Sequence, residues 1–399
     1  MKIVGVRTFV VGNPKPSHGG RYFLFLKLIT DDGVEGLGEV YVATFGPHLV
    51  ARMIEDVVER HVIGRDPFTI EAISRAVYDS GYAMRPDLTL GGVFSGIEMA
   101  LWDIVGKAVD KPVHALLGGR VRDAVRSYTY LYLEPEDEAD VYFDPTVAAR
   151  RAGEYAARGF TGVKVDPVGQ WAEFDPRQPE LVTIDRTERY VAAIREAVGT
   201  SCDVLLGTHG QFTTSGAIRL ARRLERYDPL WFEEPVPPEA PEQMALVARA
   251  TSIPIATGER LSTKHEFARV LDLGAASILQ LNLGRVGGIL EGKKIAAIAE
   301  TRYAQIAPHL YSGPVLGTAN LQLAACTPNF LILEGILDWG GFHGEILKRP
   351  IQWQDGHVLV PDGAGLGIEL DEEVAARHPY TDTYLHLEPH PGEYREPPA

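Results

Sequence analysis

The first third of the chain opens with alternating apolar and polar positions and then changes to a helical period. The runs IVGVRTFVVG (3–12) and RYFLFLKLIT (21–30) are typical of strands, and the DDG after the second run favours a hairpin into EGLGEVYV (35–42). Apolar residues then recur at helical spacing over 47–63, 69–81 and 92–109. Strands followed by helices predict an α+β module.

At residue 127 the pattern changes to short apolar runs separated by helical stretches. Eight runs are predicted as strands: SYTYLYL (127–133), GVKVDP (162–167), DVLLGTH (203–209), LWFEEP (230–235), IPIATGE (253–259), SILQLN (277–282), AQIAPH (304–309) and FLILE (330–334). Helical periodicity lies between them, for example over 145–160, 215–227, 242–251 and 289–302. Polar residues at the ends of successive runs are 23 to 27 residues apart from Gly207 to Glu334, which is the repeat of a (β/α) barrel.

The same patterns divide the chain into a cap, a barrel and a tail. Residues 1–126 form the predicted α+β capping domain, with a lid-like loop at about 13–22 that is rich in Pro and Gly. Residues 127–340 form the predicted barrel, and residues 341–399 carry hairpin signals and are expected to pack back on the cap. A longer gap before Gly207 contains an insertion over 167–185 on a βα loop.

Composition adds limits rather than a function. The formal net charge of −15 argues against nucleic acid or an anionic membrane as partner, and any site for an anionic substrate has to be local. Two cysteines, Cys202 and Cys326, make no disulfide framework and suit a reducing compartment. The N-terminus is typical of a strand rather than a signal peptide, and no run approaches the roughly 18 apolar residues of a membrane span. We expect a soluble, cytoplasmic protein.

Side chains at the carboxyl ends of barrel strands face one shared mouth. Here those ends carry Lys164, Asp166, His209, Glu233 or Glu234, Glu259, Arg260, Asn282, His309 and Glu334. Each alone says little, because a buried glutamate can be half of a structural ion pair and a lone histidine is commonly part of a core. Five or more such groups at successive strand ends are costly to desolvate unless they bind a cation or take part in chemistry. The set therefore predicts a functional site.

The residue types at these positions indicate a reaction class. Glu233 and Glu259, on adjacent strands, supply the oxygen ligands that Mg²⁺ uses, with water and substrate completing its shell. His209 and His309, at two other strand ends, can flank a substrate, one removing a proton and the other donating one. This assembly favours abstraction of a proton α to a carboxylate, with the metal and nearby cations stabilising the enediolate.

Several motifs together resemble the mandelate racemase/muconate lactonizing enzyme branch of the enolase superfamily. They are GIEMALWDIVGKAVDKPVHALLGG, WFEEP, IPIATGER, ILQLNLGRVGGI, IAPH and the tail motif GLGIEL. The likeness covers almost the whole chain and is closest to acid-sugar dehydratases of the galactonate and mannonate dehydratase type. It implies a (β/α)7β modified TIM barrel, an α/β barrel capped by the N-terminal segment and the C-terminal tail. Dimers and octamers are the habit of the family, so the resemblance also implies a homo-oligomer.

The resemblance implies a role for each matching residue. It places one Mg²⁺ per subunit on Glu233 and Glu259, at the ends of the fourth and fifth strands. His209 matches the base of the histidine-bearing dehydratases, and His309 matches the histidine after the seventh strand. Glu334 matches a carboxylate near the substrate.

Three positions depart from the family pattern. The third-strand metal ligand is an aspartate two residues before the histidine, and here that position is Gly207. The sixth-strand aspartate is here Asn282, which we expect to accept a hydrogen bond from His309 and to raise its pKa less than aspartate would. The second strand keeps Lys164 but has Asp166 where the racemases have a second lysine.

The missing carboxylate at Gly207 leaves several possibilities for the third ligand. Water can fill the position, Asp166 can supply an oxygen from the neighbouring strand, or His209 can turn inward. We favour water or Asp166, because His209 as ligand would lose its role as base and imidazole suits zinc, nickel or iron better than Mg²⁺. Asp203, four residues earlier, lies roughly 13 Å deeper. Gly207 can also mark a close approach of backbone, substrate or the insertion.

Candidates for substrate binding lie on the cap loop and beside the strand ends. His18 and Arg21 on the cap loop are candidates for the substrate carboxylate, although Arg21 can equally be a solvated loop charge. Arg260 and Asn282 are further candidates. Lys164 is either a second acid/base or, if His209 is the base, a cation near the substrate carboxylate.

The resulting hypothesis is a metal-dependent dehydratase that converts an aldonate or aldarate, a small sugar carboxylate, into a 2-keto-3-deoxy acid. His209 would abstract the α-proton and His309 would protonate the departing hydroxyl. One alternative is a racemase, epimerase or cycloisomerase with Lys164 and His309 on opposite faces. The other is a degenerate family member that binds acid sugars without turnover, which Gly207 and Asn282 suggest. The identity of the sugar is not encoded in these patterns.

Overall fold

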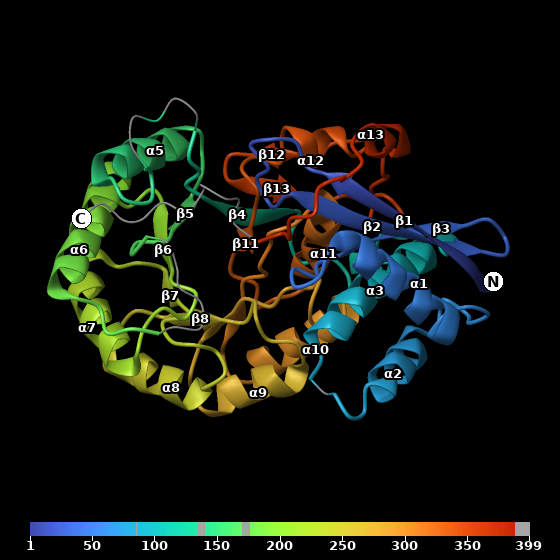
Figure 1. The fold of residues 1–399 in the computed structure, drawn as a ribbon, viewed down its shortest axis with the longest axis horizontal. Helices are drawn as coiled ribbons and strands as arrows, with labels where there is room; N and C mark the ends of the chain where they lie inside the picture. Colours follow the sequence, from blue (N-terminus) through green and yellow to red (C-terminus); the bar gives the residue numbers. More distant parts are fainter. Residues whose placement is uncertain (85, 135–136, 138–139, 170–175, 388–399) are drawn as a thin grey trace.

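The computed structural model describes residues 1–84, 86–134, 137, 140–169 and 176–387, and its elements form two groups (Figure 1). The first group is an antiparallel sheet covered by three helices. Its strands and helices are β1 (Ile3–Gly12), β2 (Tyr22–Thr30), β3 (Glu35–Val40), α1 (Pro47–His61), α2 (Ile70–Ser80) and α3 (Leu88–Ala108). Each predicted strand and helix of this segment is confirmed.

Helix α3 is the core of this capping domain. It is long and apolar enough to cross a membrane by length and composition alone, but 72% of its most apolar window is buried inside the protein. It can approach strand β3 closely because glycines lie at the contact: a Cβ added at Gly38 would be 1.9 Å from the carbonyl oxygen of Gly96. Gly38 is therefore required by the packing of helix on strand.

The second group contains all eight strands that the sequence predicts. They are β4 (Ala124–Tyr130), β5 (Gly162–Val165), β6 (Asp203–Gly207), β7 (Trp231–Glu233), β8 (Ile255–Thr257), β9 (Ile278–Leu279), β10 (Gln305–Ile306) and β11 (Leu333–Glu334). From β4 to β10 they pair in parallel and in chain order, and β11 pairs with β4. No ladder joins β10 to β11 among the described residues. The two segments are linked there by one isolated bridge, between Ile306 and Phe330. A closed (β/α)7β barrel stays a prediction.

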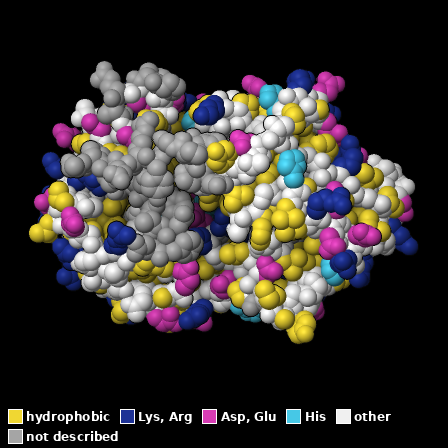
Figure 2. Space-filling model, in the orientation of Figure 1, with side chains coloured by type: hydrophobic (Ala, Val, Ile, Leu, Met, Phe, Trp, Pro, Cys, Tyr) yellow, Lys and Arg dark blue, Asp and Glu magenta, His cyan; other side chains and the backbone are white. Residues whose placement is uncertain are grey.

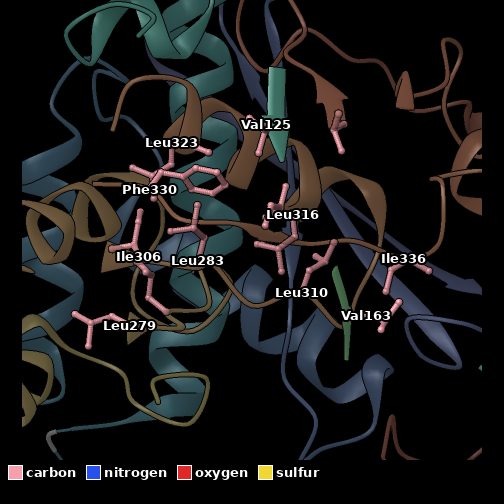
Figure 3. Packing of buried hydrophobic residues seen from close by; sticks show 14 of the residues in the cluster. Val125, Val163, Leu279, Leu283, Ile306, Leu310, Leu316, Leu323, Phe330 and Ile336 are labelled. Carbon is pink, nitrogen blue, oxygen red and sulfur yellow. The ribbon is translucent and has the colours of Figure 1, made fainter. Parts of the chain in front are cut away.

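Helices form the outer layer around these strands (Figure 1). They are α5 (Pro145–Ala157), α6 (Leu181–Val198), α7 (Thr214–Leu224), α8 (Pro241–Ala250), α9 (Lys264–Asp272), α10 (Ile289–Glu300) and α11 (Pro314–Ala325), with short turns α4 (Val113–Leu116), η1 (Glu225–Tyr227) and α12 (Phe342–Glu345). Leu316 and Leu323 of α11 belong to the same buried cluster as Leu310 and Phe330, near which Figure 3 draws them. Of the predicted insertion, residues 170–175 lie outside the described residues, and the part from Leu181 onward begins α6 rather than continuing a loop.

Inside the strands lies a separate buried cluster: Tyr128, Leu205, Trp231, Ala256, Ile278, Ala307 and Ile332. These side chains identify inward-facing positions on β4, β6, β7, β8 and β9 and beside β10 and β11. Because side chains alternate along a strand, the residue two places later, where the strand continues, faces inward as well and lies nearer the carboxyl end. This is the position from which site residues such as Glu233 project.

Two buried glutamates dock the cap on the second group. Glu39 at the end of β3 accepts hydrogen bonds from the backbone N–H groups of Gly313 and Leu316 at the start of α11. Glu98 on α3 accepts from Ile289 (2.7 Å) and Leu290 (2.9 Å) at the start of α10. The first N–H groups of a helix lack partners within it and favour a negative charge. Burial raises the pKa of both carboxyls to about 7.

The C-terminal tail divides between the two groups. Strands β12 (Trp353–Gln354) and β13 (His357–Leu359) form a hairpin, and β13 pairs with β4, so the hairpin extends the second sheet. Helix α13 (Glu372–Arg377) and the following residues lie against β1, where the Tyr380 N–H donates to the carbonyl of Val10 over 3.1 Å. On the face drawn in Figure 2, basic and acidic side chains are interspersed over the described residues.

The Gly38 contact gives a stability prediction. Gly38→Ala should lower the free energy of unfolding by about 1–3 kcal/mol or more, because the new methyl overlaps a backbone oxygen of α3. Gly153→Ala is the matched control: it lies in helix α5 with nothing within 4 Å of its added Cβ, and it should raise stability by about 0.5–1 kcal/mol. Urea denaturation of both variants measures the difference. Equal effects would contradict the close packing of α3 on β3.

Candidate active site

A cavity of about 640 Å³ lies between the cap loop and the carboxyl ends of the strands. Among the residues predicted for the site, six line it: His18, Asp166, His209, Glu259, Arg260 and His309. Tyrosines contribute much of the remaining wall: Tyr41, Tyr130, Tyr132, Tyr142 and Tyr311. The cavity is of the size expected for a small-molecule site.

Lys164, Glu233 and Glu334 are buried among the same strand ends and do not line this cavity. The Lys164 ammonium donates to Glu233 over 2.7 Å and lies 3.7 Å from Glu334. Burial alone would lower the pKa of Lys164, but the charges of Glu233, Glu334 and Glu259 outweigh burial and raise it. Lys164 is therefore held as a cation, and a proton-accepting role is disfavoured.

Glu233 has further donors besides Lys164. Gln280 Nε2 donates to it over 2.7 Å and the Trp231 indole over 3.2 Å. A buried carboxylate with three donors is well compensated. The sequence placed Glu233 at this strand end, but a saturated hydrogen-bond shell could not be foreseen from strand spacing.

His309 is fixed by a partner at each ring nitrogen. Its Nε2 lies 2.8 Å from Glu259, and its Nδ1 lies 2.7 Å from Asn282 Nδ2. The Asn282 oxygen already accepts the Gly284 N–H over 2.7 Å, so the amide presents its NH₂ to the imidazole. Asn282 is therefore a donor to His309, and the expectation that it accepts a hydrogen bond is wrong.

The neighbours of His309 have opposite effects on its charged form: the carboxylates favour it, and the Asn282 NH₂ opposes it. The neutral ring carries its proton at Nε2, toward Glu259. Burial disfavours the charged ring, but Glu259 and Glu334 outweigh burial and raise the pKa of His309. A second proton at Nδ1 would face the Asn282 NH₂, so charging the ring requires the amide to turn and to release Gly284.

His209 projects from a strained position just after β6. Its backbone φ of 49° lies in the left-handed region, which is uncommon for a residue with a side chain and is concentrated at functional sites. Its Nδ1 lies 3.9 Å from Asp166 Oδ1. The Tyr130 hydroxyl donates to the same Asp166 oxygen over 3.3 Å, and burial raises the pKa of this carboxyl.

Of the residues predicted to bind substrate, Arg260 and His18 line the cavity, whereas Arg21 does not. Arg260 lines the cavity, but its Nε donates to buried Glu234 over 2.7 Å, so a carboxylate of the protein already balances its charge. His18 stacks on Tyr132 with ring centroids 4.1 Å apart, and burial lowers its pKa to about 4, so it is neutral near pH 7. The Arg21 guanidinium lies 5.7 Å from the Tyr384 ring, and Arg21 lines a different pocket, beside the tail.

Arg285 is a cation of the cavity that the sequence reasoning missed. Its Nη1 donates to the backbone carbonyl of Glu259 over 3.0 Å, and its guanidinium lies 4.5 Å from the ring centroid of Tyr41. No ion pair with a carboxylate is found for it among the described residues. The sequence did hold a signal for Arg285, because this residue lies three positions after Asn282 and therefore just beyond the end of a strand. The tyrosines of SYTYLYL (127–133) were a similar signal, because Tyr130 and Tyr132 also line the cavity.

The carboxylates near the cavity suit a hard divalent cation by their chemistry. Asp166, Glu233, Glu259 and Glu334 lie near Lys164 and His309, and their oxygens are the donors that Mg²⁺ prefers. Among the described residues, no three acidic, histidine or cysteine side chains are gathered closely enough to hold an ion as they stand. Lys164 and His309 hold Glu233 and Glu259, and a cation would compete with those ion pairs.

Two family models match the chain over most of its length. The mandelate racemase/muconate lactonizing enzyme N-terminal domain matches residues 15–118, and the enolase C-terminal domain-like model matches residues 147–374. Among solved structures, a candidate mandelate racemase/muconate lactonizing enzyme from Labrenzia alexandrii is 58% identical, with a TM-score of 0.95 over 97% of this chain and 99% of that one. The mandelate racemase/muconate lactonizing enzyme from Jannaschia sp. is 49% identical, with a TM-score of 0.93 over 97% and 100%.

Curated relatives carry dehydratase names. The D-xylonate dehydratase of Haloferax volcanii is 33% identical over 94% of this chain and 89% of its own length. The D-galactonate dehydratase of Xanthomonas oryzae is 33% identical over 94% of both chains. The resemblance seen in the sequence motifs is confirmed, and the chain is an enzyme of the mandelate racemase/muconate lactonizing enzyme family within the enolase superfamily.

Proposed function

We propose that the protein is a metal-dependent dehydratase that converts an aldonate or aldarate into a 2-keto-3-deoxy acid. The observation that carries the proposal is the placement of two histidines, His209 and His309, from different strand ends on the wall of one cavity that also holds Glu259 and Asp166. The dehydratase names of relatives that are 32–33% identical support the reaction class. We place this activity in a cytoplasmic homo-oligomer.

The proposed cation is Mg²⁺, held by Glu233, Glu259 and Asp166. Bound there, it would supply positive charge beside the substrate carboxylate and make the neighbouring C–H more acidic. Lys164, a fixed ammonium close to Glu233, adds a second positive charge near these strand ends. Arg285 is a further candidate for the substrate's carboxylate, because its guanidinium reaches the cavity without an ion-pair partner among the described residues.

The proton transfers are assigned to the two histidines. His209 accepts the α-proton, and the nearby carboxylate of Asp166 stabilises the imidazolium that results. His309 acts from its charged form, for which the Asn282 amide has turned to accept at Nδ1: it delivers the Nε2 proton to the β-hydroxyl as it leaves, and the ring becomes neutral again. Glu334, 3.7 Å from Nε2, favours the charged form. A racemase would need a second base facing His309. Lys164 is a poor one, since its surroundings raise its pKa.

The activity can be tested by incubating the protein with a library of aldonates and aldarates in D₂O with Mg²⁺. We expect loss of water from at least one acid sugar and no turnover after chelation with EDTA. His209→Asn should slow α-proton exchange and dehydration together by about 10²–10⁴-fold, whereas His309→Asn should slow dehydration more than exchange. NMR and mass spectrometry distinguish the two. A library without exchange or dehydration would refute the proposed reaction.

The amide of Asn282 gives a second prediction. In Asn282→Asp, both carboxylate oxygens can accept, so the Gly284 N–H and a proton on His309 Nδ1 are satisfied together. The pKa of His309 should rise by roughly one unit or more. ¹⁵N NMR of histidine-labelled protein measures both the pKa and the tautomer of His309. The neutral wild-type ring should be protonated at Nε2, and the ring of the variant should stay doubly protonated up to a higher pH than the wild-type ring does.

Asn282→Ala is the control for this measurement. It removes the donor without adding charge, and the pKa of His309 should move less than in Asn282→Asp. A neutral wild-type ring protonated at Nδ1 would contradict the assigned direction of the Asn282 hydrogen bond.

A further inference from the structure

We propose that Asp166, directly after β5, binds the cation in place of the carboxylate that is missing at Gly207 on β6. One ligand of the cation then comes from the second strand instead of the third. On this view Gly207 is a glycine because the Asp166 carboxylate occupies the space of its side chain. The inference rests on the proposed function only in assuming a divalent cation at these strand ends.

The register of the strands puts the two positions side by side. Strands β5 and β6 pair with Val165 beside Leu206, so the next residues, Asp166 and Gly207, are level. Strands β6 and β7 pair with Gly207 beside Glu233. Level residues on neighbouring parallel strands point to the same face. Asp166, Gly207 and Glu233 therefore form one row across three strands.

This row faces the interior. Two residues earlier on β6 and β7 are Leu205 and Trp231, which belong to the buried cluster inside the strands. Since alternate residues share a face, position 207 points the same way, one layer nearer the cavity. A carboxylate at 207 would lie between Asp166 and Glu233, so a carboxylate from 166 that leans toward 207 reaches the same region.

The space at position 207 is already taken. A Cβ added there would lie 2.6 Å from Asp166 Oδ1, 3.0 Å from Lys164 Cε and 3.2 Å from the Tyr130 hydroxyl. The first distance is shorter than any ordinary contact, so a side chain at 207 requires the Asp166 carboxylate to move. The backbone offers no other reason for glycine, because Gly207 is absent from the glycines with positive φ.

Asp166 also has more capacity left for a cation than Glu233 or Glu259. Glu233 accepts from Lys164, Gln280 and Trp231, and Glu259 is held by His309 at 2.8 Å. Asp166 has the Tyr130 hydroxyl at 3.3 Å and His209 at 3.9 Å, and it lines the cavity. A buried carboxylate with such long contacts gains more from an ion than one already saturated.

The test exchanges the two residues and measures Mn²⁺ binding by electron paramagnetic resonance and calorimetry on the full chain, since Mn²⁺ prefers the same oxygen ligands as Mg²⁺. Asp166→Gly and Asp166→Asn should weaken Mn²⁺ binding at least tenfold. Gly207→Asp alone should lower the melting temperature because two carboxylates collide, and Gly207→Ala should do so through its methyl. The double variant Asp166→Gly/Gly207→Asp should recover both Mn²⁺ affinity and melting temperature relative to the single variants.

The outcomes separate this inference from the proposed reaction. Wild-type Mn²⁺ affinity in Asp166→Gly, or a double variant no better than Gly207→Asp in melting temperature and affinity, would overturn the exchange. Wild-type protein that binds no Mn²⁺ would overturn it as well. Recovery in the double variant supports it even if no acid sugar is dehydrated, in which case the proposed reaction alone fails.

Discussion

The cavity exists because two carboxylates of the cap are buried against helix starts of the second group. Glu39 and Glu98 accept backbone N–H groups at the beginnings of α11 and α10, which are the helices that follow the strands carrying His309 and Asn282. Each unsatisfied buried donor would cost about 1–3 kcal/mol, so the contacts constrain the docking strongly. Tyr41, two residues after Glu39, is thereby brought to the cavity wall.

A second constraint is the balancing of charge at the strand ends by the protein itself. Lys164 lies on Glu233, Arg260 on Glu234 and His309 on Glu259. Pairing of this kind lets several ionisable groups be buried together, because an isolated buried charge is far more costly than a paired one. It also means that a ligand that binds one of these paired groups competes with an internal partner instead of with water. The affinity of the site therefore depends on how easily those pairs reopen.

The sequence predicted the strands of both groups and the residues at their ends, because alternation and spacing are properties of the backbone pattern. It did not predict the orientation of these side chains or the partners that they bind. The Asn282 amide is oriented by Gly284, and Arg21 turns to Tyr384 on the tail. The hairpin of β12 and β13 was visible, but its pairing with β4 is a contact between residues about 230 apart in the chain. Such long-range choices leave little trace in local periodicity.

The row that joins Asp166, Gly207 and Glu233 also constrains the history of the site. A chain with carboxylates at both 166 and 207 brings them into collision, and a chain with neither leaves the row with Glu233 alone. Any lineage that exchanges one arrangement for the other passes through one of these two less favourable forms. The two positions are therefore expected to change together among relatives, and a search for family members by the third-strand acid alone would discard chains of this kind as defective.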